Sequence, residues 1–159
     1  MSLPARLTRY LDQRGARYEL RMHDHSRTSA QTARMAQVPP AQLAKSVLLE
    51  DEDGCVMAVV PADQMVMVGE LARLLGRKAL HLSDEASLAA WFDGCEPGAV
   101  PPVGMAWDVE TVVDDALGQA PVVYLEGGDH ECLLQMSREQ FLALMDGQRH
   151  GHFCKTPVH

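Results

Sequence analysis

Lys45 is the first residue whose type and position suggest chemistry. It lies near the start of an apolar run, residues 44–50, between Pro39-Pro40 and the acidic turn at residues 51–54. The run is predicted to be a buried strand, with residues 55–61 as its hairpin partner. A lysine at the mouth of such a hairpin reaches solvent, pairs with an acid or holds an anionic ligand, and the strand alone leaves these three roles open.

The loop at residues 93–104 is the second unusual stretch. It holds three glycines and three prolines in twelve residues, with alanine and valine between them. Proline fixes φ and glycine permits close backbone approach, so we predict a rigid, partly buried loop that offers main-chain N–H groups to a ligand. A purely structural crossing fits the pattern equally well. The loop has neither the Lys-Ser/Thr of a P-loop nor a GxGxxG motif.

Histidines and cysteines suggest metal or thiol chemistry less clearly. His23 and His25 make only two ligands and are interpreted as a strand-end pair. His130 and Cys132 are expected on one face of a strand, and Cys95 beside His130 is a minor candidate for a thiol nucleophile. The tail from Gly147 carries His150, His152 and Cys154, which are interpreted as part of a frayed terminus. We expect no metal site and no cofactor.

The remaining pattern alternates helices and strands. Helices are predicted near residues 3–14, 30–36, 69–75, 84–92 and 138–145, and strands at 18–22, 78–82, 105–108, 111–113, 122–125 and 130–136. Ser137–Gln140 reads as a capping box, with Phe141, Leu142, Leu144 and Met145 facing inward. We expect one domain over residues 1–146, followed by a flexible tail over residues 147–159.

Composition limits the classes of function. The chain has 159 residues and a net charge of −8, with +5 on residues 1–49 (eight basic, three acidic) and −13 on residues 50–159 (six basic, nineteen acidic). Specific or strong DNA binding is therefore not expected, although the arginines of the first part could meet one phosphate strand. The sequence shows no membrane span or signal peptide, and its four dispersed cysteines favour the cytoplasm.

Four features occur in one order: a lysine opening the central strand, a hairpin ending in Val-Val-Pro-Ala, the loop Gly-Ala-Val-Pro-Pro-Val-Gly at residues 98–104, and Gly-Gly-Asp-His at residues 127–130. This arrangement resembles the YbaK/EbsC family, the editing domains associated with prolyl-tRNA synthetase. The resemblance covers roughly residues 15–146. It implies a mixed α/β fold, with a curled, mostly antiparallel sheet forming a half-barrel flanked by helices.

The resemblance also implies an activity, hydrolysis of the ester between a wrong amino acid and tRNA, performed in trans by free-standing members. By position, Lys45 matches the family lysine, Gly98 and Pro102 match a Gly-x-x-x-Pro loop, and His130 falls where some members carry a histidine. We expect Lys45 to hold a phosphate or sugar oxygen, the amides near Gly98 to stabilise the oxyanion, and His130 to contact the α-amine or a water, if it is not simply a strand-end histidine. Residues expected to contact substrate are Ser46, Ala99, Pro101, Pro102 and Gly128.

The partner implied by this reading is the 3′ end of an aminoacyl-tRNA, with a synthetase as a second candidate. An alternative from another class is a non-catalytic sensor that binds an aminoacyl or nucleotide-like ligand and reports it to a protein. Hydrolysis distinguishes the two. A DNA-binding role ranks third and would show a steep dependence of affinity on salt.

Overall fold

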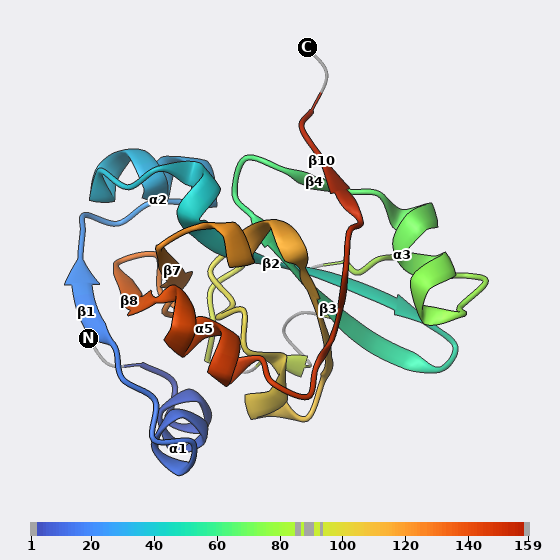
Figure 1. The fold of residues 1–159 in the computed structure, drawn as a ribbon, viewed down its shortest axis with the longest axis horizontal. Coiled ribbons are helices and arrows are strands. Elements are labelled where there is room, and N and C mark those ends of the chain that lie inside the picture. Colours follow the sequence, from blue (N-terminus) through green and yellow to red (C-terminus); the bar gives the residue numbers. More distant parts are fainter. Residues whose placement is uncertain (1–2, 85–86, 88–90, 93, 158–159) are drawn as a thin grey trace.

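A computed structural model describes residues 3–84, 87, 91–92 and 94–157. In this part of the chain one large sheet has the order β1-β8-β7-β2-β3-β6-β9, with β5 added to β2, and β4 and β10 form a separate pair (Figure 1). The strands are β1 (Glu19–Met22), β2 (Leu43–Asp51), β3 (Gly54–Pro61), β4 (Met65–Val66), β5 (His81–Leu82), β6 (Glu110–Asp114), β7 (Val122–Glu126), β8 (Cys132–Ser137), β9 (Arg149–Gly151) and β10 (Cys154–Lys155).

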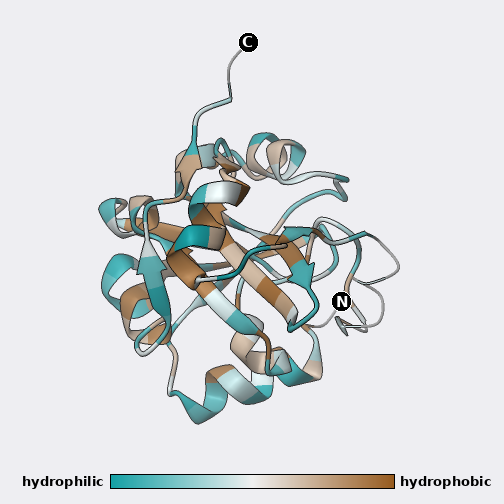
Figure 2. Cartoon of the chain, turned by 90° about the vertical axis from the view of Figure 1, so that its right-hand side faces the viewer, coloured by the Kyte–Doolittle hydropathy of each residue, from teal (hydrophilic) through white to brown (hydrophobic). Residues whose placement is uncertain are grey.

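Helices pack on both faces of the sheet because its central strands are apolar on both sides (Figure 2). α1 (Ala5–Gln13) and α5 (Arg138–Leu144) share one core cluster with β7 and β8, and α2 (Ser29–Ala36) shares another with β2 and β7. α3 (Val68–Leu75) belongs to a third cluster with β3. Short 3-10 turns are η1 (Pro40–Gln42), η2 (Gly104–Trp107) and η3 (Asp115–Gln119).

The β2–β3 hairpin forms as expected and lies at the centre of the sheet. Its antiparallel register runs from Ala44 opposite Pro61 to Asp51 opposite Gly54. Most of the strand pairs are antiparallel, whereas β2–β7, β3–β6 and β6–β9 are parallel. These pairings confirm the expected mixed α/β fold with a largely antiparallel sheet.

The β2–β7 pairing is short. It joins Leu43 to Tyr124 and Ala44 to Leu125, and no further pair follows. The next residue on each strand is Lys45 and Glu126, respectively. The sheet therefore has a seam at its centre, where two parallel strands meet for two residues and then separate. Clefts for ligands commonly form where parallel strands part at their carboxyl ends.

Some predicted elements differ from the structure. Met105–Trp107 belong to η2 rather than to a strand, and the left-handed Asp108 (φ +58°) ends this turn. The strand predicted at residues 78–82 is reduced to β5, and Leu142 on α5 is 50% exposed rather than inward. Part of the helix predicted at residues 84–92 lies outside the described residues.

His130 also departs from its predicted place. It has φ +61° and lies in the turn before β8, so it does not share a strand face with Cys132. The Asp129 carboxylate accepts a hydrogen bond from the Glu131 N–H at 2.8 Å and shapes this turn. The result is a histidine that is only 2% exposed, beneath the loop that begins near Gly94.

The segment after Gly147, for which a flexible tail is predicted, contains the strands β9 and β10. β9 pairs with β6, and β10 pairs with β4. Phe153 is fully buried between them, and its N–H donates to Asp114 Oδ2 at 2.8 Å. A buried aromatic side chain and a buried main-chain hydrogen bond fix the segment in place.

Candidate functional site

Lys45 follows the last β2 residue paired to β7 and is partly buried. Its Nζ donates to the Ala62 carbonyl at 3.4 Å, and the ion pairs of the described residues include none for Lys45. Burial lowers the pKa of Lys45, while the Asp63 carboxylate opposes that shift. The ammonium therefore lacks a close carboxylate partner, which is the state expected of a lysine that holds an anionic ligand.

Glu126 ends β7 on the other side of the seam. Its side chain is 1% exposed, and neither carboxylate oxygen has a hydrogen-bond partner within the described ranges. The nearest cationic atom is His130 Nδ1, 3.4 Å from Oε2. This separation is long for a hydrogen bond, so we treat the contact as an ion pair. A buried carboxylate without a full set of partners is costly, which makes Glu126 a candidate functional residue.

His130 joins this carboxylate to the glycine-rich loop. Its Nε2 lies 2.6 Å from the Pro97 carbonyl oxygen, so that nitrogen donates its hydrogen. Burial by itself lowers the pKa of His130, but Glu126 and the Pro97 carbonyl outweigh burial and raise the pKa above 6.5. Both ring nitrogens face acceptors, which favours the doubly protonated imidazolium.

The Pro97–Gly98 peptide is oriented by this contact. A trans peptide is planar, with its C=O and N–H pointing in opposite directions. Because His130 holds the Pro97 oxygen, the Gly98 N–H points away from His130, and it donates to no residue that the structure describes. Gly98 is exposed and has φ +78°, and a Cβ there would lie 3.4 Å from the His130 ring. The chain thus presents a fixed, unused main-chain donor at its surface.

Further contacts hold the same loop. Ser46 Oγ donates to the Val100 carbonyl at 2.9 Å, and the Glu96 N–H donates to the Gly128 carbonyl at 2.8 Å. His25 Nε2 lies 2.9 Å from the Glu96 carboxylate. The loop is therefore tied to β2, to the turn before β8 and to the segment after β1.

The structure thus brings most of the predicted site residues together. His130 and Gly98 are adjacent, and Ser46 and Gly128 anchor the loop. Lys45 lies on the opposite face of β2 from Ser46, since side chains alternate along a strand. The remaining predicted contact residues, Ala99, Pro101 and Pro102, are buried and build the interior of the loop.

Glu126 was missed by the sequence reading. It directly follows the apolar strand residues 122–125 and precedes Gly127-Gly128. An acid that ends a buried strand is unusual and could have been singled out on that ground. The minor candidate Cys95 gains no support, because both nitrogens of His130 are engaged by other groups.

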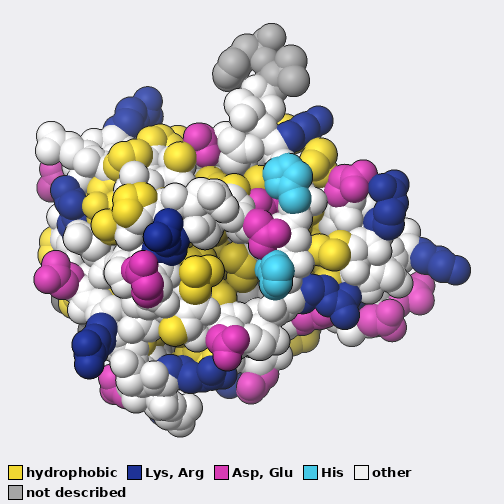
Figure 3. All heavy atoms as spheres, in the orientation of Figure 1, with side chains coloured by type: hydrophobic (Ala, Val, Ile, Leu, Met, Phe, Trp, Pro, Cys, Tyr) yellow, Lys and Arg dark blue, Asp and Glu magenta, His cyan; other side chains and the backbone are white. Residues whose placement is uncertain are grey.

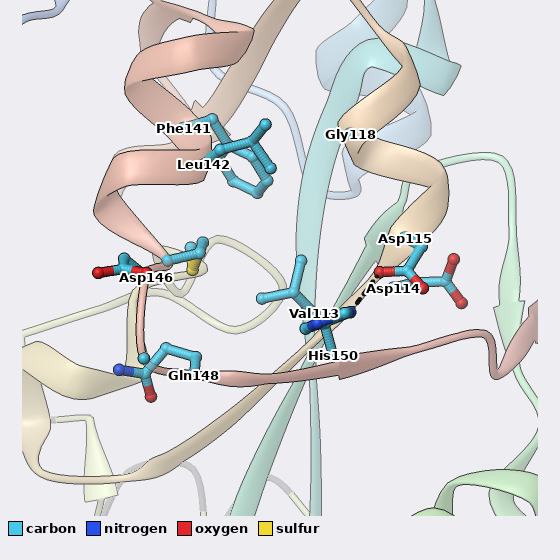
Figure 4. Close-up of a pocket in the computed structure, with 11 residues that line it drawn as sticks. Val113, Asp114, Asp115, Gly118, Phe141, Leu142, Asp146, Gln148 and His150 are labelled. Carbon is cyan, nitrogen blue, oxygen red and sulfur yellow. Dashed lines mark hydrogen bonds and ion pairs between the residues drawn. The ribbon is translucent and has the colours of Figure 1, made fainter.

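A separate cavity of about 250 Å³ lies between α5, η3 and β9 (Figure 4). Its walls include Val113, Phe141 and Leu142, and its rim carries the Asp115–His150 pair. None of the predicted site residues lines it. On the face drawn in Figure 3, basic side chains are scattered rather than gathered in one patch. No helix in the described ranges is long and apolar enough to cross a membrane.

Comparison with known proteins places this arrangement in a family. The sequence profile described as "Aminoacyl-tRNA editing domain" matches residues 23–144. The "Proline--tRNA ligase" of Xanthomonas oryzae pv. oryzae is 33% identical over 88 residues, covering 55% of this chain and 15% of the ligase. The "Putative Cys-tRNA(Pro)/Cys-tRNA(Cys) deacylase EbsC" of Enterococcus faecalis is 28% identical over 106 residues, covering 64% of this chain and 62% of that protein. The chain therefore spans less than two thirds of these curated relatives.

Solved structures share the fold. A crystal structure of "a putative trans-editing enzyme for prolyl tRNA synthetase" superposes with a TM-score of 0.81 at 24% identity, over 97% of this chain and 99% of that one. The profile match covers well over half of the present sequence, and the fold agrees over nearly all of it. The chain belongs to the YbaK/EbsC family of aminoacyl-tRNA editing domains.

Proposed function

We propose that this chain is a deacylase that acts in trans and hydrolyses the ester between an amino acid and the 3′ end of a mischarged tRNA. The observation that carries the proposal is the Pro97–Gly98 peptide, which His130 holds so that the Gly98 N–H is available to a ligand. Lys45 supplies a partly buried cation where β2 leaves β7, on the face of β2 opposite to the loop. The family to which the chain belongs supports this activity.

The chemistry requires little more than positioning. An aminoacyl ester is activated, so water can add to its carbonyl carbon without a protein nucleophile. The Gly98 N–H then stabilises the oxyanion of the tetrahedral intermediate, and removal of such a donor typically costs about a hundredfold or more in rate. The intermediate collapses by breaking the acyl C–O bond, and the ribose hydroxyl leaves with a proton.

His130 is a positioning residue in this scheme. Its two nitrogens face Pro97 and Glu126, so it has no free lone pair with which to take a proton from water or to accept from an α-ammonium group. The expected contact of His130 with a water or the α-amine is therefore replaced by a role in fixing the loop. Lys45 holds a phosphate or sugar oxygen of the terminal nucleotide.

A sensor without catalytic activity is the second candidate. It is favoured by a fold similarity to "a Putative signal transduction protein" from Marinobacter aquaeolei VT8, with a TM-score of 0.76 and 22% identity. The match covers 96% of this chain but 31% of that protein, so the fold also occurs as one part of a longer chain. A sensor would bind the aminoacylated end and release it unchanged.

Deacylation of a panel of tRNAs distinguishes the two candidates. The panel carries Ala, Ser, Thr, Cys or Pro, and each ester is followed with wild type, Lys45→Ala and the exposed control Lys78→Ala. We expect rapid loss of one or two esters with wild type and Lys78→Ala, and loss slowed to near the uncatalysed rate with Lys45→Ala. Stable esters throughout, with retained binding of the tRNA end, would reject the deacylase and favour the sensor.

A further inference from the structure

Three potential metal ligands meet where the C-terminal segment crosses the end of β6. They are the Asp114 carboxylate, a His152 ring nitrogen and the Cys154 thiol, and their ligand atoms all lie within 4.8 Å of one another. Asp114 and Cys154 are almost fully buried, whereas His152 is exposed. None of the three belongs to the Gly98 loop or to the turn that holds it, but Cys154 lies close enough to Lys45 for the two groups to interact electrostatically.

The chain path explains why the three converge. Phe153 and Cys154 are both buried in the core cluster of β3 and α3, and His152 is exposed beside Asp114. Asp114 is held by two main-chain donors, the N–H of Ala116 at 2.9 Å and that of Phe153 at 2.8 Å. His152 Nδ1 lies 3.6 Å from Asp114 Oδ1.

We propose that Asp114, His152 and Cys154 form a binding site for Zn²⁺. One thiolate, one imidazole and one carboxylate are a ligand set that suits this borderline-soft ion, with a water in the fourth position on the exposed side. Tetrahedral zinc bonds of about 2.0–2.3 Å place ligand atoms roughly 3.3–3.8 Å apart, so shifts of about 1 Å close the site. The two N–H groups on Asp114 orient the carboxylate in the way that outer hydrogen bonds orient metal ligands.

The ion would tie the C-terminal segment to β6. The other contacts that hold this segment include the buried Phe153, the short β9 and β10 pairings and the hydrogen bonds of Phe153 to Asp114 and Met67. Metal that binds only the folded protein stabilises it by mass action. The proposal does not rest on the deacylase activity.

A neighbouring histidine provides a matched control. His150 lies two residues earlier, is equally exposed (72% against 71% for His152) and also contacts a carboxylate, Asp115 Oδ1, at 2.8 Å. Figure 4 shows His150 joined to Asp115 at the rim of the apolar cavity. Each variant removes one exposed imidazole beside one carboxylate, and only His152 belongs to the proposed ligand set, so a difference between the two variants in Co²⁺ demand reports on the metal.

The experiment is a titration of the full, metal-stripped protein with Co²⁺, which reports thiolate ligation through a near-ultraviolet charge-transfer band. We expect a band that saturates at one ion per chain and is bleached by Zn²⁺. It should be lost in Cys154→Ser, require at least tenfold more Co²⁺ in His152→Ala, and persist in His150→Ala.

Thermal unfolding with Zn²⁺ gives a second readout. We expect the midpoint to rise with Zn²⁺ for wild type and His150→Ala and to change less for His152→Ala, which alters only an exposed side chain. A wild-type protein without the band, an equal band in Cys154→Ser, or equal Co²⁺ demand in His152→Ala and His150→Ala would overturn the proposal.

Discussion

Gly98→Ala tests whether the loop acts through one main-chain donor. Gly98 has φ +78°, in the left-handed region that an L-residue with a Cβ adopts at a cost of about 1–2 kcal/mol. The added Cβ would lie 3.4 Å from the Arg27 carbonyl oxygen and from the His130 ring, so the side chain itself fits. The strain is relieved only if the backbone rotates, and this turns the Gly98 N–H away from its present direction.

The two consequences have different sizes. The backbone cost lowers the melting temperature by roughly 2–4 °C for each kcal/mol in a chain of this length. Loss of an oxyanion donor lowers kcat about 100- to 1000-fold. The substitution leaves the proposed contacts of Lys45 with the nucleotide unchanged, so KM should change little, which is the signature of an interaction made in the transition state.

The assay measures kcat, KM and melting temperature for Gly98→Ala and for Gly94→Ala, with the best ester of the tRNA panel. Gly94 lies in the same loop with φ +89°, and a Cβ there meets nothing within 4 Å. Both variants should lose similar stability, and only Gly98→Ala should lose kcat. If the two variants hydrolyse the ester equally fast, the Gly98 N–H does not stabilise the oxyanion.

Three further predictions concern stability. Because the pKa of His130 is raised in the folded chain, its pair with Glu126 stabilises fully below pH 6.5, and this contribution fades as the pH rises through the folded-state value. In urea unfolding, the free energy of unfolding should therefore fall less with rising pH in Glu126→Gln than in wild type. If it falls equally in both proteins, the His130–Glu126 pair does not contribute to stability. Phe153→Ala should lower the free energy of unfolding by about 3–5 kcal/mol, whereas a frayed tail predicts no change. The Arg77 side chain is 15% exposed and contacts both the Asp51 carboxylate, which is 6% exposed, and the Glu110 carboxylate, at 3.0 Å each. Arg77→Ala should therefore lower the free energy of unfolding by about 3 kcal/mol in the same measurement. A loss near zero would show that water replaces the two ion pairs.

Local signals were sufficient for the central hairpin. The apolar runs on either side of the turn at residues 51–54 have the length and composition of strands, and the turn sets their register. The same local logic failed at Met105–Trp107. Gly104 lies against the Thr111 side chain and the Val109 carbonyl, where no Cβ fits, and local hydrogen bonds from Ala106 and Val109 then close a 3-10 turn.

Long-range contacts explain the other differences. Phe153 is ordered by Asp114, which is 39 residues earlier, and nothing near Phe153 in the sequence signals that bond. The capping box at Ser137 is half formed, because Gln140 N–H donates to Ser137 Oγ while the Gln140 side chain accepts from the Arg17 N–H. Sequence spacing predicts helix starts of this kind, but it does not reveal that a distant main-chain N–H binds the Gln140 side chain in place of the Ser137 N–H.

The candidate site likewise combines residues that local motifs predicted with an arrangement that depends on long-range contacts. Lys45, Gly98 and His130 were found through the order of motifs, yet their arrangement depends on contacts across the chain. His130 reaches Pro97 over 33 residues, and its left-handed backbone gives no signal in sequence because non-glycine residues rarely adopt it. Glu126 acquires its importance only once His130 is turned back towards it.

The short β2–β7 seam has a mechanical consequence. Two paired residues on each strand connect a β1-β8-β7 layer to a β2-β3-β6-β9 layer, so the sheet is weakest at its centre rather than at its edges. The Gly98 loop already joins the two layers through Ser46 on β2 and Gly128 before β8, and a tRNA end held by Lys45 and by this loop would add a further link. Substrate should then slow amide hydrogen exchange at Leu43–Ala44 and Tyr124–Leu125 more than elsewhere. Binding would thus reduce local opening of the central β2–β7 pairing.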